Sequence, residues 1–326
     1  MRTDDALVSV VIPAHQAATF IEQTVRSVLA QDHRQLEIIV VDDASTDDTR
    51  RILRRLMERD PRIRLVEFES NLGVVAARNR ALQEATGAWV AFLDADDVWL
   101  PGKISAQLSF VASSPELDPT RVGIGTRGAY LGRRRGPLGS LGQAGDVTST
   151  LRRAGALPFR LSSLMVSRDA LLAIGGFSDD LSWTGAEDYD LMVRLAISGC
   201  TMIGLPERLM WYRLHLDSVS SQQYLVQKAA SGYITLRAEA LREQRPVPGP
   251  ETFAFDRHLG GAIPRRYRPQ LWFRMAGVEL VDGSILRAAW LLTKALVADP
   301  GYTWRRLRSR IRIPARGRKP KVASCT

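Results

Sequence analysis

The sequence contains few of the residues that cross-link small folds or build metal clusters. Two cysteines and four histidines occur among 326 residues. Cys200 and Cys325 lie far apart in the chain, so we expect neither a disulfide framework nor a cysteine-based metal site. A reducing, cytoplasmic setting fits this cysteine usage best.

Long apolar segments are also missing. The run over residues 7–12 is short and is followed by Pro13, which does not fit a secretory signal peptide. The most apolar late segment, residues 285–297, contains Arg287 and Lys294. Because charged side chains interrupt this short segment, we do not expect it to span a bilayer.

Motifs of several enzyme classes are absent as well. The sequence has no G-x-x-x-x-G-K-S/T, no G-x-G-x-x-G after an expected strand, no G-x-S-x-G and no H-E-x-x-H. Their absence disfavours phosphate-loop ATPases, dinucleotide dehydrogenases, α/β-hydrolases and zinc proteases of the zincin type.

Positive charge is concentrated at one end of the chain. The net charge is +10, and residues 301–326 hold nine Lys and Arg and no acidic residue, so the rest of the chain carries only about +1. A near-neutral body argues against a nucleic-acid-binding protein. In the tail, apolar residues alternate with arginines, which suits an anionic membrane surface; a disordered solubilising tail is the alternative reading.

What is present is a repeated strand-then-helix pattern. Short apolar runs alternate with segments whose apolar residues have helical spacing, which predicts an α/β fold with parallel strands joined by right-handed crossovers. The expected strands are residues 8–12, 36–41, 63–68 and 89–93, and the expected helices include residues 20–29 and 74–85.

The second half of the chain is less regular. Residues 123–145 are rich in Gly and Arg without periodicity, so we interpret them as a mobile or variable loop. Further expected strands are residues 161–167, 201–205 and 210–214, and expected helices are residues 168–174, 222–242, 269–278 and 285–297.

Carboxylates follow two of the expected strands. Asp94, Asp96 and Asp97 come directly after residues 89–93, and Asp42 and Asp43 come directly after residues 36–41. The carboxyl ends of parallel strands meet at one edge of a sheet, where α/β proteins bind ligands. The D-x-D spacing of Asp94 and Asp96 offers two carboxylates to a divalent cation, or to a cation and a ribose, although a surface acidic turn is the structural alternative.

Three further sites have two readings each. Arg78, near the start of a helix, could reach a base or a diphosphate, or simply be solvated. Glu187 and Asp188 at a helix start could complement the helix dipole, or one of them could act as a general base. His215 at a strand end is structural by default and a third metal ligand if it meets the D-x-D residues.

Taken together, these segments resemble the family 2 glycosyltransferases, inverting enzymes with a GT-A fold. Seven blocks match in the family's order: VSVVIPAHQAATFIEQTVRSVLAQ (residues 8–31), EIIVVDDASTDDT (37–49), NLGVVAARNRAL (71–82), GAWVAFLDADDVW (87–99), GGFSDDL (175–181), AEDYDLMVRLA (186–196) and YRLHLDSVS (212–220). The resemblance implies a mixed, mainly parallel sheet flanked by helices, with a helical C-terminal extension.

The resemblance also implies roles for individual residues. A nucleotide-diphospho-sugar would be bound by Pro13, Ala14, Asp42, Asp43, Arg78 and Asp94. Asp96 and His215 would hold Mn²⁺ or Mg²⁺, Asp188 would be the catalytic base, and Glu187 would support it.

The implied domain organisation follows the motifs. We expect a GT-A domain over residues 1–220, with a nucleotide-sugar half at 1–100 and an acceptor half at 101–220. A helical extension would cover residues 221–300 and a basic tail residues 301–326. The expected location is cytoplasmic, with the tail bringing the chain to the cytoplasmic face of a membrane.

The expected activity is transfer of one sugar to a hydroxyl of a glycan or lipid-linked acceptor, in cell-surface polysaccharide or glycolipid synthesis. The alternative is an inactive nucleotide-sugar-binding subunit with an assembly or regulatory role. His15 and Gln16 stand where the family often has an aromatic residue and Asn, which leaves the nucleotide base open. The Q-x-x-R-W motif of processive members is absent, which favours single addition.

Overall fold

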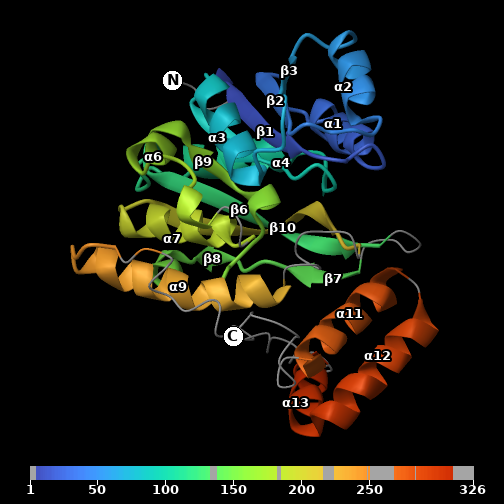
Figure 1. Cartoon of the computed structure of the whole chain (residues 1–326). Coiled ribbons are helices and arrows are strands. Elements are labelled where there is room, and N and C mark those ends of the chain that lie inside the picture. Colours follow the sequence, from blue (N-terminus) through green and yellow to red (C-terminus); the bar gives the residue numbers. More distant parts are fainter. Residues whose placement is uncertain are drawn as a thin grey trace, which may run out of the picture. The chain divides into compact units, whose positions relative to one another are not determined.

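The computed structural model describes residues 5–132, 138–181, 185–215, 224–247, 249, 268–282 and 284–310. The chain divides into two compact units (Figure 1). The first comprises residues 1–260 with 281–283, and the second residues 261–280 with 284–326.

The first unit begins with the expected strand-helix repeats. Strands β1, β2 and β4 are almost fully buried because their residues are mostly apolar or β-branched, whereas the edge strand β3 is buried only at Ile63. Each helix presents an apolar face to the sheet. The elements are β1 (Val8–Ala14), α1 (Ile21–Leu29), β2 (Leu36–Asp42), α2 (Thr49–Met57), β3 (Ile63–Glu67), α3 (Val74–Glu84) and β4 (Trp89–Phe92).

The sheet is mixed and has ten strands among the described residues. Its main path runs β3-β2-β1-β4-β9-β6-β10-β5, and β7 and β8 pair with β6 and β10. The first four strands are parallel, which confirms the α/β expectation. The later strands are β5 (Val98–Trp99), β6 (Val122–Leu131), β7 (Leu138–Leu141), β8 (Gly145–Asp146), β9 (Met165–Ser167) and β10 (Thr201–Arg213).

The interpretation of residues 123–145 as a variable loop is wrong for the part that the structure describes. Strand β6 lies inside the sheet between β9 and β10. Its glycines serve close packing: a Cβ at Gly123 would lie 2.8 Å from Met202 Sδ, and one at Gly125 would lie 2.5 Å from the Phe159 ring. The glycines of β6 therefore lie inside a strand. In a dinucleotide-binding turn, by contrast, the glycines come directly before a helix. Residues 133–137 lie outside the described part.

Two other expectations change in detail. The segment 161–167 forms a 3₁₀ turn, η2 (Leu161–Ser163), before β9. The expected strands 201–205 and 210–214 are one strand, β10, with register shifts between Leu205 and Arg208 and between Arg208 and Met210. Such bulges let a long strand bend, so that its end can turn toward the ligand-binding edge of the sheet.

Helices complete the first unit. They are α4 (Lys103–Ala112), α5 (Thr148–Arg152), α6 (Arg168–Ala173), α7 (Glu187–Ile197) and α9 (Tyr224–Arg242). Helix α9 packs against α7 and contributes Tyr233 and Ile234 to the same apolar core as β2 and β4. The sequence analysis assigned α9 to a C-terminal extension, but it belongs to the first unit; the proposed division at residue 220 stays a prediction.

The second unit contains α11 (Arg268–Asp282) as far as Leu280, together with α12 (Ile285–Ala298) and α13 (Pro300–Arg310), with α12 packed on α13. The expected helices in this part of the chain are thus present. Across the described ranges, none of the helices has the length and hydropathy needed to span a bilayer.

Candidate active site

A cavity of about 560 Å³ opens at the carboxyl ends of β1 and β4. Ligands of α/β proteins bind at this edge because loops from neighbouring parallel strands converge there. The expected site residues that line it are Pro13, Ala14, Asp43, Arg78, Asp94, Asp96, Glu187, Asp188 and His215. Residues from positions 13 to 215 therefore meet in one place.

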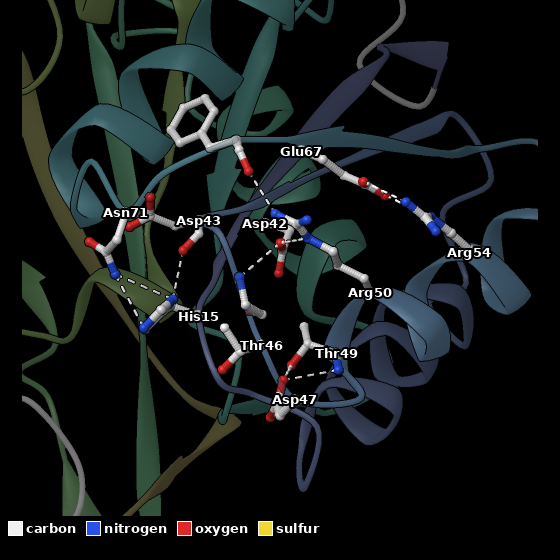
Figure 2. Close-up of polar contacts among 12 residues, drawn as sticks. His15, Asp42, Asp43, Thr46, Asp47, Thr49, Arg50, Arg54, Glu67 and Asn71 are labelled. Carbon is white, nitrogen blue, oxygen red and sulfur yellow. Dashed lines mark hydrogen bonds and ion pairs between the residues drawn. The ribbon is translucent and has the colours of Figure 1, made fainter.

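Hydrogen bonds between the Asp43 side chain and backbone N–H groups hold the loop after β2 in place. The Asp43 carboxylate accepts hydrogen bonds from the N–H groups of Leu72 and Gly73, at 2.7 and 2.9 Å. Figure 2 shows the contact between the His15 ring and Asp43. The Nδ1 atom of His15 lies 2.6 Å from the Asp43 carbonyl oxygen. Since a carbonyl only accepts, Nδ1 carries the hydrogen, and Nε2 is left to accept from Asn71 at 3.2 Å.

Asp42 is the one expected nucleotide-binding residue that does not line the cavity. Its side chain is fully buried and accepts from Arg50 Nε at 2.5 Å and from the Ser45 N–H at 3.1 Å (Figure 2). Arg50 also donates to the Phe68 carbonyl oxygen. Adjacent residues of an extended chain point to opposite sides, so Asp43 faces the cavity while Asp42 ties β2 to α2.

Arg78 connects two carboxylates across the cavity wall. Its two terminal nitrogens donate to Asp94 Oδ1 and to Glu187 Oε1, both at 2.7 Å. Arg78 and Glu187 are buried, and these carboxylates raise the pKa of the guanidinium despite its desolvation. The helix-start residue Glu187 is therefore committed to an ion pair, and Arg78 holds the ends of β4 and α7 together.

The D-x-D turn meets the end of β10. Asp96 Oδ2 lies 2.8 Å from His215 Nε2, and the His215 ring packs against Phe20 with centroids 5.2 Å apart. This contact is the one expected if His215 joins the D-x-D residues in a metal site. Because 119 positions separate Asp96 from His215 in the chain, the sequence alone could not show that their side chains meet.

Asp97, which received no role from the sequence, is fully buried beneath this turn. Its Oδ1 accepts from the Arg213 N–H at 2.8 Å, and Arg213 Nε donates to the Asp96 carbonyl oxygen at 2.7 Å. Burial, followed by the nearby Asp96 and Asp94 charges, raises the pKa of Asp97. The pair fixes the backbone two residues before His215 and so positions that imidazole beside Asp96.

The pKa of the Asp188 carboxyl is raised by its place in the cavity wall. Burial raises its pKa to about 6, the neighbouring Glu187 carboxylate adds to the increase, and the charges of Arg78 and Arg160 oppose it. A base whose pKa lies just below neutral is ionised at pH 7 and still accepts a proton readily. Asp188 therefore has the environment that a general base needs.

Arg160 is the main site residue that the sequence analysis missed. Its guanidinium lies 4.6 Å from the Tyr212 ring centroid and lines the cavity beside Asp188. It sits in a stretch without periodicity or a recognisable motif, so only the tertiary structure brings it to the site.

A divalent cation fits this donor set when phosphate oxygens complete it. Among the residues that the structure describes, no group of three or more His, Cys, Asp or Glu side chains could hold a metal alone. Mg²⁺ sites commonly combine one or two carboxylates with water and substrate phosphates. Asp96 with His215 suits that arrangement, whereas Asp94 is already paired with Arg78.

Comparison with known sequences gives a family match in the N-terminal part of the chain. Residues 9–161 match the family model described as "Glycosyl transferase family 2". The matched range includes the D-x-D turn and ends before α7, so it does not cover Asp188 or His215.

Two curated relatives illustrate the similarity. TuaG of Bacillus subtilis (strain 168), named for teichuronic acid biosynthesis, is 50% identical over 105 residues, which are 32% of this chain and 42% of TuaG. WfaP of Escherichia coli, a UDP-Glc:alpha-D-GlcNAc-diphosphoundecaprenol beta-1,3-glucosyltransferase, is 29% identical over 67% of this chain and 81% of its own length. The alignment to TuaG thus covers less than half of the length of TuaG.

Solved structures share the fold over nearly the whole chain. A mannosyltransferase from Pyrobaculum calidifontis, in complex with GDP-Man and Mn²⁺, has a TM-score of 0.54 and 25% identity, covering 94% of this chain and 79% of that one. TarS residues 1–349 of S. aureus give a TM-score of 0.54 at 18% identity, covering 93% and 92%. The second likeness concerns the fold alone.

Proposed function

We propose that this chain, whose residues 9–161 belong to glycosyl transferase family 2, moves one sugar from a nucleotide-diphospho-sugar to an acceptor hydroxyl with inversion. The observation that carries the proposal is Asp188, a carboxylate with a pKa of about 6 in the wall of a cavity that also holds the Asp96–His215 pair. A proton acceptor and a diphosphate-binding edge thus share one site.

In the proposed reaction, Asp188 accepts the proton of the acceptor hydroxyl as its oxygen bonds to the anomeric carbon. The bond from that carbon to the nucleoside diphosphate breaks, and the leaving group departs with the electron pair. Attack from the face opposite the leaving group inverts the configuration, so a single base suffices. The Arg160 charge beside Asp188 favours the ionised, proton-accepting form before reaction.

Asp96 and His215 would hold Mn²⁺ or Mg²⁺ on the diphosphate. When bound, the cation would neutralise the charge that develops on the leaving group. The Mn²⁺ complex of the Pyrobaculum mannosyltransferase supports this part of the proposal. Pro13, Ala14 and Asp43 would line the nucleotide side, and Arg78 would keep Asp94 in place at the ribose or diphosphate.

The acceptor would be a glycan or a lipid-linked sugar. WfaP is named for a diphosphoundecaprenol-linked sugar acceptor and TuaG for teichuronic acid biosynthesis, which supports this class of acceptor. The alternative of an inactive assembly subunit requires a site unable to turn over, and the complete set of Asp96, Asp188 and His215 argues against it.

An anionic membrane surface is the proposed partner of the second unit. Helix α12 exposes Leu286, Trp290 and Val297, at 87%, 58% and 78%, one below another at helical spacing. Helix α13 follows with four arginines, and the tail continues the basic run. Apolar side chains next to basic ones suit the interface of anionic lipid. Residues 311–326 lie outside the described part.

Binding of donors provides the direct test. Thermal unfolding would be followed with UDP-, GDP- and dTDP-sugars, each with Mn²⁺, Mg²⁺ or a chelator. We expect one nucleotide class to raise the Tm, and to do so more with the cation than with the chelator. No stabilisation by any nucleotide sugar would contradict the proposal.

A further inference from the structure

A second cavity lies beside the proposed donor cavity. It has a volume of about 420 Å³ and shares Arg160, Gly185, Asp188 and Gln227 with its neighbour. Its other walls are residues 154–157 and the face of α9. Asp188 therefore stands where the two cavities join, and a group bound in the second one can reach the same carboxylate.

The two cavities differ in charge. Five carboxylates line the first: Asp43, Asp94, Asp96, Glu187 and Asp188. In the second, the charged lining residues are Arg160 and Asp188, whose opposite charges interact with each other. Among the lining residues that the structure describes, Arg160 is the one cation that a phosphate or a carboxylate would meet there, and Asp188 already offsets its charge, so the second cavity suits an uncharged ligand.

The face of α9 that lines the second cavity carries hydroxyl groups that can accept hydrogen bonds. The Ser231 hydroxyl donates to the Gln227 carbonyl oxygen and the Thr235 hydroxyl to the Ser231 carbonyl oxygen, both at 3.0 Å. Because each hydroxyl hydrogen is used within the helix, each oxygen can accept a hydrogen bond from a ligand. The Gln227 side-chain amide can both donate and accept. This wall therefore favours a ligand that carries several hydroxyl groups.

Small residues give the remaining walls their shape. Without bulky side chains, the cavity can admit a ring edge-on against the backbone. These residues are Ala154, Gly155, Ala156, Gly185, Ala186 and Gly232. Tyr189 adds one aromatic surface, and sugar rings carry apolar C–H faces that such surfaces contact.

We infer that this second cavity binds the acceptor sugar as a neutral, hydroxyl-bearing ring, and that Ser231 and Thr235 of α9 select it. The inference rests on the proposed function because Asp188 must serve both cavities. It adds the charge class of the acceptor ring and two residues that determine specificity, on a helix outside the range that matches the family model.

The test is direct binding of small glycosides, observed by saturation-transfer-difference NMR on the full chain. The probes are methyl glycosides of glucose, galactose, mannose and N-acetylglucosamine, with methyl glucuronide as the charged counterpart. We expect at least one neutral glycoside to give a signal and the glucuronide to give none. Ser231→Phe, which fills the cavity, should abolish the signal, and Thr235→Val should weaken binding by about fivefold.

Leu236→Phe is the matched control, because Leu236 is the next residue on α9, is 43% exposed and does not line the cavity. It should leave glycoside binding unchanged. Donor-induced thermal shifts in each variant verify that the chain is folded and that the first cavity is intact. Thr235→Val keeps the test valid if Ser231→Phe does not fold.

Two results would overturn the inference. One is glycoside binding that survives in both folded α9 variants; the other is a glucuronide signal as strong as the neutral ones. Absence of all glycoside signals in a chain that still responds to nucleotide sugars would refute the inference alone. If nucleotide sugars fail as well, the proposed function fails and takes this inference with it.

Discussion

Nε2 of His215 lies 2.8 Å from Oδ2 of Asp96, although 119 positions separate the two residues in the chain. The contact exists because the end of β10 pairs with β5, the short strand that follows the D-x-D turn after β4. Asp97 strengthens it by binding the backbone of Arg213. The arrangement places one carboxylate and one imidazole at the rim of the cavity, and several consequences can be measured.

Replacing Asp96 by Asn should remove most of the cation-dependent part of nucleotide binding. The neutral amide is a weaker ligand for a hard cation, so the Kd of the nucleoside diphosphate with Mn²⁺ should rise by at least about tenfold. Titration calorimetry with and without Mn²⁺ measures the difference. Glu58→Gln, at an exposed carboxylate that ends α2 and does not line the cavity, removes the same charge and should have no effect. Unchanged Mn²⁺ dependence in Asp96→Asn would reject the metal assignment.

Replacing Arg78 by Met should destabilise the first unit strongly. It would leave Glu187 buried and unpaired and Asp94 without its ion pair, which typically costs about 3–5 kcal/mol. Urea unfolding monitors the loss. Arg80→Met on the same helix breaks the Arg80–Glu84 pair, whose arginine is 45% exposed, and should cost at most about 1 kcal/mol. Equal effects of the two substitutions would show that Arg78 has no special structural role.

Replacing Asp42 should lower the stability of the chain without weakening nucleotide binding. Asp42→Asn weakens the buried bond to Arg50 and should lower stability while leaving the nucleotide Kd within about twofold, since the side chain does not line the cavity. Calorimetry on the folded fraction gives the comparison. A selective loss of nucleotide affinity in Asp42→Asn would restore the nucleotide-binding role expected from the sequence.

The apolar stripe of α12 should govern binding to lipid. Trp290→Glu should reduce flotation of the chain with vesicles containing phosphatidylglycerol, because a charge enters the face that meets the membrane. Leu172→Glu, at an exposed leucine of α6, is the matched control and should float like the wild type. Flotation with neutral vesicles should be weaker throughout. Equal flotation of both variants would argue against a membrane-facing α12, and a monomer-dimer change in Trp290→Glu would instead identify a self-association surface.

Much of the first hundred residues could be predicted from the sequence because local pattern and burial coincide there. Residues of β1, β2 and β4 are mostly apolar on both faces, as in a sheet covered by helices, and the carboxylate motifs of this part follow β2 and β4 directly. The pattern locates the edge of the sheet that binds ligands. It does not say which of two adjacent aspartates faces the cavity, because that depends on the exact residue at which the strand ends.

The remaining misses have physical causes too. The glycine-rich composition of residues 123–145 is typical of a loop. Gly125 is nevertheless needed inside β6, because the Phe159 ring occupies the space that a side chain at position 125 would fill. Arg160 has no local motif, and its role arises from the charge of Asp188 and the ring of Tyr212, which lie elsewhere in the sequence. Packing between distant segments carries this information, and a single sequence does not display it.

The central claim is that Asp188 removes the acceptor proton, and the pH dependence of turnover tests it most directly. With its pKa raised to about 6, Asp188 is ionised above that pH, so kcat/KM of the wild type should fall about tenfold per pH unit below it. Asp188→Asn should bind the nucleotide sugar normally, lose at least about 100-fold in turnover at pH 7.5 and lose the inflection near pH 6. Wild-type turnover in Asp188→Asn, or an unchanged inflection, would contradict the account.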